Sequence, residues 1–292
     1  MNHENYIAVD WGSTHLRAWH VQQNEIKNQL QVAMGVTRLG STNAAEVFAQ
    51  YIAPWRDALD VPVVMAGMIG SEAGWKSIPY VSCPVSLVSL AQHLCPVGEQ
   101  IWIVPGLKVE EADVSNVMRG EETQLLGASQ LSPSSWYVMP GTHCKWVQMN
   151  EGQVVHFETV MTGELHHLLM THSLLGAGLP QQESDEAAFE QGVQKGLQSP
   201  SILPRLFETR AAWVLNSLPR ASVSDFLSGL LIGAEVAAQC HAWQPSSVTL
   251  VGNQSLTTRY QQALSRAGIG VQCCDGDAAF LQGVRSIIYA GQ

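Results

Sequence analysis

The chain has 292 residues, of which 46% are hydrophobic and 14% are charged, so a disordered chain is excluded and two lobes with buried cores are possible. Its formal net charge of −10 argues against nucleic acids and anionic membranes as partners, because both bind basic surfaces.

Cysteine usage and apolar runs place the protein in a compartment. The six cysteines show no C-x-x-C spacing, no signal peptide precedes the first predicted strand, and the longest apolar stretches (61–70 and 227–238) are too short or too interrupted to span a bilayer. We therefore expect a cytoplasmic protein with no membrane partner.

The first predicted element is a strand, a tight turn and a second strand within residues 6–19. The first strand ends at Asp10, and the turn that follows contains Gly12, Ser13 and Thr14. Glycine lets a backbone approach a ligand closely, and successive turn N–H groups can bind an anion. Asp10 could hold a hydrated Mg²⁺ against nucleotide phosphates there. An ordinary hairpin, with Asp10 accepting local hydrogen bonds, explains this segment equally well.

A loop with three glycines follows the next buried strand. A strand at 29–33 and a helix at 44–59 lead to a strand at 61–66, which runs into the loop 67–76. Ligands of α/β sheets bind at the carboxyl ends of strands. We therefore expect sugar contacts in this loop; the candidates are Ser71, Trp75 and Lys76. The alternative is a flexible connector with a packing tryptophan.

Two adjacent carboxylates begin the helix predicted within residues 116–128. Glu121 and Glu122 fall in its first turn, where the helix dipole favours negative charge. One of them could instead be the general base that accepts a proton from an attacking hydroxyl. Neighbouring residues on a helix point about 100° apart, so only one can face a cleft. We prefer Glu121 to Glu122.

The hairpin pattern recurs half a chain later. Residues 136–149 again read as an apolar strand, a turn with Gly141 and Thr142, and a second apolar strand. Two such turns suit a two-lobed phosphate clamp, with lobes 1–130 and 131–292. Neither a P-loop pattern nor G-x-G-x-x-G occurs, which weakens P-loop and Rossmann alternatives.

The remaining segments are mostly helical. Thr162 is a candidate cap for a helix that carries Glu164, which could line an acceptor pocket, and His166, His167 and His172 lack the spacing of a metal site. Further helices are expected at 189–197, 202–218, 223–239 and 278–290. Gly229 and Gly233 in the third of these would permit close helix contact, and Ala279 and Gly283 in the last suit tight packing at the lobe interface. The strand 248–251 ends at Gly252, where a helix start could form an adenosine shelf or simply a plain βα turn.

Together these segments resemble a known superfamily. Two glycine hairpins are the pattern of actin-like, ribonuclease H-like ATPases, which include many sugar kinases. Within that group the chain is similar over essentially its whole length to the 2-dehydro-3-deoxygalactonokinase family. The matching segments are IAVDWGSTHLRAW (7–19), GVTRL (35–39), PVVMAGMIGSEAGWK (62–76), PYVSCP (79–84), NVMRGEETQLLGA (116–128), YVMPGTHCKWVQ (137–148), TVMTGELHHLL (159–169), GAGLP (176–180) and FLSGLLIGAE (226–235).

The resemblance implies an α/β, two-lobed actin-like ATPase (ribonuclease H-like) sugar kinase fold. It implies transfer of phosphate from ATP, with Mg²⁺, to the 6-hydroxyl of 2-dehydro-3-deoxy-D-galactonate, a small sugar acid. Asp10 would hold the Mg²⁺ through water, and both glycine turns would bind phosphates. Glu121 would accept the 6-hydroxyl proton; related sugar kinases place an aspartate where this chain has Glu121 and Glu122, so the base stays open between them. A homo-oligomer is compatible with this family.

An anionic substrate also needs cations in a chain this acidic. Lys145, just past the second turn, would reach a phosphate or the substrate. The substrate carboxylate needs a bidentate cation, for which the candidates are Arg17, Arg38 and Arg119.

Other functions share the hairpins. An actin-like ATPase without a sugar substrate would not need the 67–76 loop or an acid beside Arg119. A non-catalytic sugar-acid sensor would not need Asp10 or the two glutamates. A kinase of another sugar acid or of a hexosamine stays open, because sequence does not firmly separate epimers.

Overall fold

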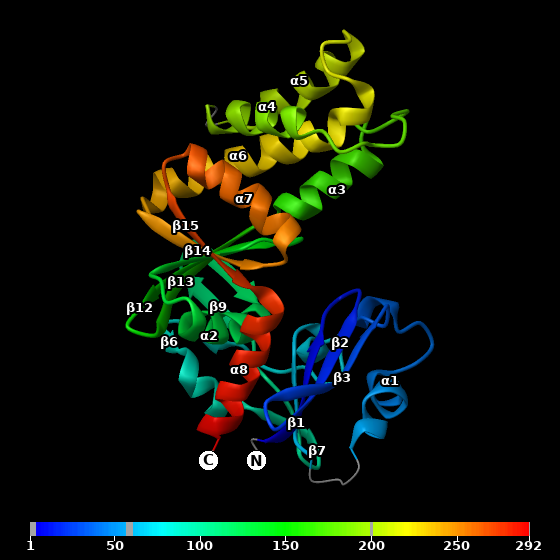
Figure 1. Ribbon diagram of the computed structural model, residues 1–292, viewed down its shortest axis with the longest axis vertical. Coiled ribbons are helices and arrows are strands. Elements are labelled where there is room, and N and C mark those ends of the chain that lie inside the picture. The colour runs from blue at the N-terminus through cyan, green and yellow to red at the C-terminus, as the bar shows by residue number, and fades with distance from the viewer. Residues whose placement is uncertain (1–3, 57–60, 199–200, 292) are drawn as a thin grey trace. The chain divides into compact units, whose positions relative to one another are not determined.

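The computed structural model describes residues 4–56, 61–198 and 201–291 (Figure 1). It divides into two compact units. Unit 1 comprises Met1–Pro133, Val147–Phe157 and Cys274–Gln292, and unit 2 comprises Ser134–Trp146 and Glu158–Cys273. The chain first passes from unit 1 to unit 2 after Pro133, close to the expected lobe boundary at 130/131. The final helix, expected in the second lobe, lies in unit 1.

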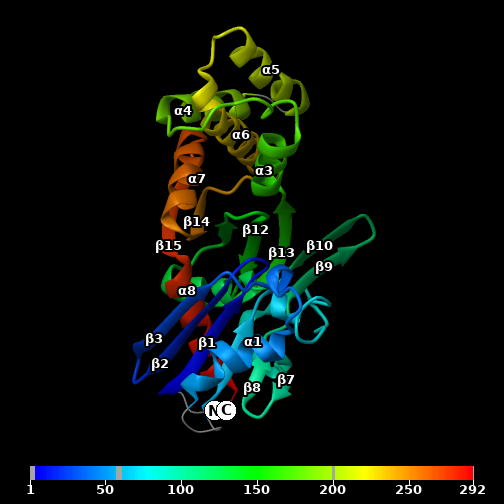
Figure 2. The same ribbon diagram turned by 90° about the vertical axis from the view of Figure 1, so that its right-hand side faces the viewer.

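Unit 1 is built on a six-stranded sheet in the order β3-β2-β1-β4-β8-β7. Its strands are β1 (Asn5–Trp11), β2 (Leu16–Gln22), β3 (Glu25–Val32), β4 (Val63–Ala66), β7 (Cys95–Gly98) and β8 (Ile101–Ile103). Strands β1, β2 and β3 are antiparallel neighbours that lie side by side in Figure 2, whereas β1, β4 and β8 run parallel. Asp10 pairs with Ala66, so the turn after β1 and the loop after β4 leave the same edge of the sheet.

The helix after β3 is shorter than expected. Helix α1 (Ala44–Tyr51) is capped by Asn43, whose side chain accepts from the backbone N–H of Glu46 at 2.9 Å. It does not continue to residue 59, because Pro54 has no N–H to donate and the chain tightens into a 3₁₀ turn at Ala53–Trp55. Residues 57–59 of that prediction lie outside the described residues.

Two glycines join the last helix to unit 1. Helix α2 (Glu121–Leu131) packs on α8 (Gly276–Ala290), as Figure 1 shows. A Cβ on Gly127 would lie 1.8 Å from the carbonyl oxygen of Ala279, and one on Gly283 would lie 1.9 Å from that of Thr123. The helices can meet at this distance only without those side chains, and this contact explains why α8 belongs with the first half of the chain.

Short strands fill the segment between β4 and α2. A three-stranded sheet has the order β10-β9-β5. The elements concerned are β5 (Val81–Ser82), β6 (Val85–Ser86), a 3₁₀ helix at Leu87–His93, β9 (Leu107–Glu111) and β10 (Val114–Met118).

Unit 2 has most of the helices. The second six-stranded sheet follows the order β15-β14-β11-β12-β13-β6. The strands are β11 (Trp136–Met139), β12 (Cys144–Asn150), β13 (Gln153–Val160), β14 (Ser247–Gly252) and β15 (Gly270–Asp275). The helices are α3 (Thr162–His172), α4 (Glu186–Leu197), α5 (Leu203–Val214), α6 (Val223–Trp243) and α7 (Gln254–Arg266).

Helices α4 and α6 are in backbone contact along four glycines. A Cβ on Gly229 would lie 2.1 Å from the carbonyl oxygen of Phe189, and one on Gly192 would lie 2.1 Å from that of Phe226. Gly196 and Gly233 continue the contact one turn further. The sequence prediction that glycines of this helix permit close contact is confirmed.

We expect Gly229→Ala to lower the free energy of unfolding by about 1–3 kcal/mol, because the added methyl overlaps the α4 backbone. The effect opposes helix propensity, which favours alanine by about 1 kcal/mol. Chemical denaturation measures it, with Ala238→Ser on the exposed face of α6 as the control, expected within about 0.5 kcal/mol of wild type. A more stable Gly229→Ala protein would contradict the packing.

One helical stretch of the described residues, Arg220–Trp243, could cross a membrane by length and composition alone. It includes α6 and is longer than the expected apolar stretch 227–238. Because 67% of its apolar window is buried inside the protein, the apolar surface serves the core of unit 2.

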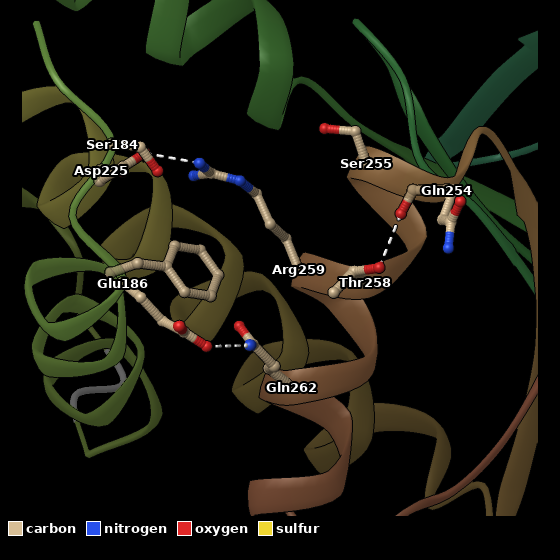
Figure 3. A pocket seen from close by; sticks show the side chains of 9 residues that line it. Ser184, Glu186, Asp225, Gln254, Ser255, Thr258, Arg259 and Gln262 are labelled. Atoms are coloured by element: carbon tan, nitrogen blue, oxygen red, sulfur yellow. Dashed lines mark hydrogen bonds and ion pairs between the residues drawn. The ribbon is translucent and has the colours of Figure 1, made fainter.

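A cavity of about 490 Å³ lies among α4, α6 and the first turns of α7 (Figure 3). Arg259 crosses it to pair with Asp225 at 2.5 Å and lies over the ring of Phe189 at 4.8 Å. Gln262 donates to Glu186 at 3.2 Å. The remaining lining residues are Ser184, Gln254, Ser255 and Thr258.

Candidate active site

The first glycine turn, residues 12–14, is a hairpin as predicted. The N–H of Gly12 donates to the carbonyl of His15 at 2.9 Å, closing the turn between β1 and β2. The GVTRL segment packs directly on it, because a Cβ on Gly35 would lie 2.3 Å from the carbonyl oxygen of Ser13. The N–H of Thr37 also donates to that oxygen, at 2.9 Å. Arg38 is thereby held in the segment that packs against the first turn.

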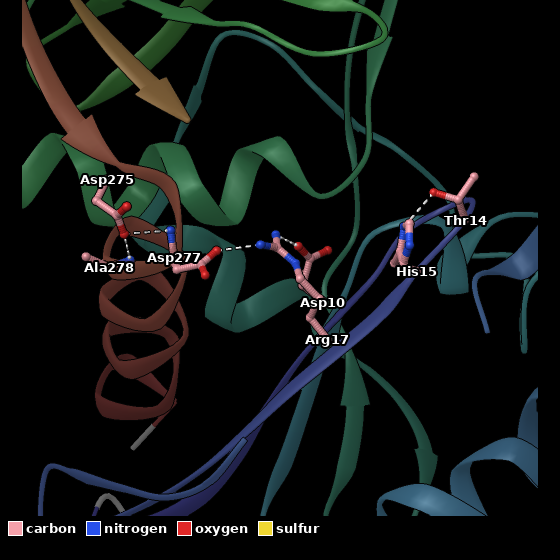
Figure 4. A network of polar contacts seen from close by, with 7 residues as sticks. All are labelled: Asp10, Thr14, His15, Arg17, Asp275, Asp277 and Ala278. Carbon is pink, nitrogen blue, oxygen red and sulfur yellow. Dashed lines mark hydrogen bonds and ion pairs between the residues drawn. The ribbon is translucent and has the colours of Figure 1, made fainter. Parts of the chain in front are cut away.

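Asp10 lies at the end of β1 in a network of charged groups (Figure 4). Arg17 donates from Nη2 to Asp10 and from Nη1 to Asp277 of α8, the latter at 2.5 Å. Burial raises the pKa of Asp10, the carboxylates of Glu121 and Asp277 raise it further, and Arg17 opposes them. Asp10 is thus a largely buried carboxylate with two other acids close enough to affect its charge.

Two glycines with positive φ leave the space beside Asp10 free of side chains. Gly67 has φ +99°, and a Cβ there would lie 2.7 Å from the carbonyl oxygen of Trp11 and 3.5 Å from Oδ1 of Asp10. Gly120 has φ +113°, and its Cβ would lie 3.1 Å from Cα of Gly67. Side chains at either position would be strained and would crowd the carboxylate.

This surrounding fits Mg²⁺ bound through water better than a metal enclosed by protein ligands. Among the described residues no group of three or more His, Cys, Asp or Glu could hold a metal ion. Mg²⁺ commonly uses one or two carboxylates together with substrate phosphates and keeps several waters. Asp10 beside a side-chain-free wall meets that need.

The two adjacent glutamates have different surroundings. Glu122 is fully buried, accepting from the N–H of Gly120 at 2.7 Å and from the Thr123 hydroxyl at 3.1 Å. Glu121 is half-buried, accepts from the N–H of Arg119 at 3.1 Å, and acts electrostatically on Asp10. Of the two, Glu121 is therefore the carboxylate that a hydroxyl near Asp10 could reach.

Glu122 should make stability depend on pH. Burial and the neighbouring Glu121 raise the pKa of Glu122 to about 8 from its usual value of 4.5. Because the folded pKa is the higher one, this contribution to stability is fully present below pH 4.5 and is lost as pH rises to about 8. We expect wild type to lose stability relative to Glu122→Gln over that window, by up to about 1.4 kcal/mol per pH unit. Urea unfolding at pH 5, 6.5 and 8 measures this, and parallel pH profiles would disprove it.

The loop 67–76 is ordered by its own contacts. The Ser71 hydroxyl donates to the carbonyl of Met68 at 2.7 Å, and Lys76 Nζ donates to that of Pro96 at 3.2 Å. Trp75 packs on Phe48 of α1 with ring centroids 5.2 Å apart. Trp75 therefore packs on the core, as the alternative of a connector with a packing tryptophan expected, and the sugar contacts of this loop stay a prediction.

The three candidate arginines differ in how far they are engaged. Arg17 is paired with two carboxylates, as described above. Arg119 donates to the carbonyl of Ile78 at 2.7 Å and lies 4.2 Å over the Tyr80 ring, while its Nε and Nη1 are buried without a partner among the described residues. The Arg38 side chain is exposed, and its guanidinium has no ion pair or hydrogen bond within the described ranges. Arg38 is thus the guanidinium that is open to a ligand.

The second glycine turn, residues 140–143, is packed by the start of α3. A Cβ on Gly163 would lie 2.5 Å from the carbonyl oxygen of Gly141, and the N–H of Glu164 donates to the carbonyl of Thr142 at 3.0 Å. The Glu164 carboxylate pairs with His143 at 2.6 Å. Glu164 therefore supports this turn.

The structure differs from the predictions made for two residues of this region, Lys145 and Thr162. Lys145, expected to reach a ligand, is only 3% exposed, and its Nζ donates back to the carbonyl of His143 at 3.3 Å. Thr162 is not the cap of α3: Met161 occupies that position, because the Thr162 hydroxyl donates to Glu235 instead.

The βα turn at Gly252 lies beside the second turn. A Cβ on Gly252 would be 3.7 Å from the carbonyl oxygen of Pro140, in ordinary contact. Asn253 caps α7 by accepting from the N–H of Leu256 at 3.0 Å. Since Gln254 and Ser255 line the cavity of Figure 3, the second turn, the shelf and the cavity form one continuous region of unit 2.

Sequence reasoning missed several residues that border these sites. Asp277 and the cavity pair of Arg259 and Asp225 gave no local signal, because their partners are far away in the sequence. Glu235 carried a signal that was overlooked: it is an acid in the middle of a mostly apolar helix.

An α/β chain with a strand-ending aspartate beside one glycine turn, and a second glycine turn in its other unit, has the fold of the actin-like ATPases that include sugar kinases. The model of the 2-keto-3-deoxy-galactonokinase family matches residues 10–287, and the chain belongs to this family.

Individual proteins of the same family are similar to the chain over almost its whole length. A 2-dehydro-3-deoxygalactonokinase of Escherichia coli K12 is 55% identical over 98% of both chains. A crystal structure of a Sinorhizobium meliloti protein, assigned as a 2-dehydro-3-deoxygalactonokinase, is 32% identical and superposes with a TM-score of 0.90 over 98% of both chains. Component A of the (R)-2-hydroxyglutaryl-CoA dehydratase of Acidaminococcus fermentans, 12% identical with a TM-score of 0.52 over 99% of both chains, shares the fold alone.

Proposed function

We propose that this protein transfers the γ-phosphoryl group of ATP to the 6-hydroxyl of 2-dehydro-3-deoxy-D-galactonate, giving the 6-phosphate used in D-galactonate breakdown. Membership of the 2-keto-3-deoxy-galactonokinase family is the observation that carries the proposal. The acidic pair of Asp10 and Glu121 beside a side-chain-free wall supports it, because a kinase needs a charge centre and an acceptor for the hydroxyl proton.

In this proposal Asp10 holds Mg²⁺ through water, and the metal supplies neutralisation of phosphate charge. The first turn, with Gly12, Ser13 and Thr14, binds phosphate through its backbone N–H groups. Glu121 takes the proton of the 6-hydroxyl. Its partial exposure and its effect on the Asp10 charge support that role over Glu122, which is buried and tied to the helix start.

The substrate carboxylate is assigned to Arg38. The support is that its guanidinium is exposed and lacks an ion-pair or hydrogen-bond partner among the described residues, in contrast to Arg17 and Arg119. Ser71 and Trp75 belong to the loop after β4, which we assign to the substrate and which their contacts help to order.

The rest of the nucleotide is assigned to unit 2. Gly141 and Thr142 contact phosphate. Lys145 contributes positive charge from beneath the turn, and Glu164 stabilises the conformation of the turn. Gly252 and the adjoining cavity take the adenosine, since a volume of about 490 Å³ is in the range of small-ligand pockets. We further propose a cytoplasmic location, which the six free thiols support.

A coupled assay of ADP release tests the proposed function. ATP and Mg²⁺ are supplied with 2-dehydro-3-deoxy-D-galactonate, with its gluconate epimer, or with no sugar. We expect release to require the galactonate derivative. ADP release at the same rate without a sugar would instead indicate an actin-like ATPase, and preference for the epimer would indicate a kinase of another sugar acid.

A further inference from the structure

A carboxylate inside unit 2, that of Glu235 on α6, has no role in the reaction described so far. It is 5% exposed. Its Oε1 accepts from Trp146 Nε1 at 2.7 Å, and its Oε2 accepts from the Tyr260 hydroxyl at 2.7 Å and from the Thr162 hydroxyl. A carboxylate is tolerated in a protein interior when such donors replace its water. Glu235 is therefore a well-partnered acceptor at the centre of this unit.

The donors Trp146, Thr162 and Tyr260 come from three elements that each carry part of the assigned nucleotide site. Trp146 is in β12, which starts directly after the second turn. Thr162 is the first residue of α3, and the following residue, Gly163, packs on the backbone of the second turn. Tyr260 is in α7, the helix that begins just after the adenosine shelf. One side chain on α6 thus links the turn, the helix that supports it and the shelf.

We propose that Glu235 is a positioning residue for ATP, which holds the second turn and the adenosine shelf in one arrangement before the nucleotide arrives. Backbone donors stabilise phosphate charge best when they are fixed in advance, so that binding requires no reorganisation. The inference rests on the proposed function, because it takes the second turn to be a phosphate contact.

A purely structural network would give a different result. If the hydrogen bonds only stabilised the fold, losing one would lower stability without changing the affinity of the folded protein for ATP. If they position the site, ATP binding weakens while binding of the sugar acid, whose assigned contacts are in unit 1, stays the same.

The test uses two substitutions at Thr162 and one control. Thr162→Val removes the hydroxyl at nearly constant shape, whereas Thr162→Ser keeps it. Thr171→Val removes an exposed hydroxyl elsewhere on α3, one that donates only to the carbonyl of His167. Titration calorimetry of the full chain with Mg²⁺ and a non-hydrolysable ATP analogue measures affinity, and steady-state kinetics give KM for each substrate.

We expect Thr162→Val to weaken binding of the analogue by roughly 10-fold to 100-fold, with KM for the sugar acid unchanged. Thr162→Ser and Thr171→Val should bind the analogue like wild type. Wild-type affinity in Thr162→Val, equal losses in the valine and serine variants, or a parallel rise in KM for the sugar acid would each overturn the proposal. If Thr162→Val does not fold, Tyr260→Phe, with the same expected loss, decides by the same criteria. A wild-type protein that binds the analogue but phosphorylates no sugar acid would contradict the proposed function alone, because the calorimetric comparison still decides the role of Glu235.

Discussion

Replacing Asp10 by Asn should lower kcat by on the order of 10²-fold or more, because preorganised charge at the reacting phosphate contributes at least that much. The substitution keeps the size of the side chain and removes the charge that would hold Mg²⁺. Arg17 keeps its second carboxylate, Asp277, so the network of Figure 4 should lose one contact and remain folded. The measurement is kcat at saturating ATP, Mg²⁺ and sugar acid, together with the melting temperature.

Asp277→Asn is the matched control for Asp10→Asn. It removes the other carboxylate that accepts from the same guanidinium, but Asp277 is more exposed, at 46% against 18% for the side chain of Asp10. We expect Asp277→Asn to lower kcat much less than Asp10→Asn does. Turnover close to wild type in Asp10→Asn, in a folded protein, would remove Asp10 from the reaction.

Glu121→Gln is expected to lower kcat by about 10²-fold to 10⁴-fold, the usual contribution of a general base. Glutamine keeps the shape and can still accept from the N–H of Arg119, but it cannot accept the proton of the sugar hydroxyl. KM for ATP should change little, because the side chain is not assigned to the nucleotide. Single-turnover kinetics with the sugar acid would locate the loss in the chemical step.

Glu122→Gln separates the two carboxylates. Glu122 is buried and bonded to Gly120 and Thr123, so its replacement should affect stability more than kcat. A large loss of kcat in Glu122→Gln with none in Glu121→Gln would reverse the assignment of the base.

Local patterns were sufficient for the elements next to the site. The first hairpin was predictable because its strands alternate and its turn contains Gly12, and Asp10 was recognisable because it ends an apolar strand. The close helix contact at Gly229 was predictable for a similar reason, since small residues at helical spacing leave a flat surface. In each case the signal lies within about a dozen residues of its consequence.

Contacts between residues far apart in the sequence could not be predicted from such local patterns. Arg17 pairs with Asp277, 260 residues later, so its engagement could not be read from the turn alone. The burial of Lys145 depends on the elements that cover β12. Ala279 and Gly283 indicated tight packing of helix α8, but its partner Gly127 lies too far away in the sequence to be identified from a local pattern.

The most direct measurement is the position of the phosphate in the product. Wild-type protein is incubated with Mg²⁺, ATP and 2-dehydro-3-deoxy-D-galactonate, and the product is examined by phosphorus and carbon NMR. We expect a single phosphate ester with coupling to C6 and one ADP formed per ester. Inorganic phosphate released beside unchanged sugar acid, or an ester on another hydroxyl, would contradict it.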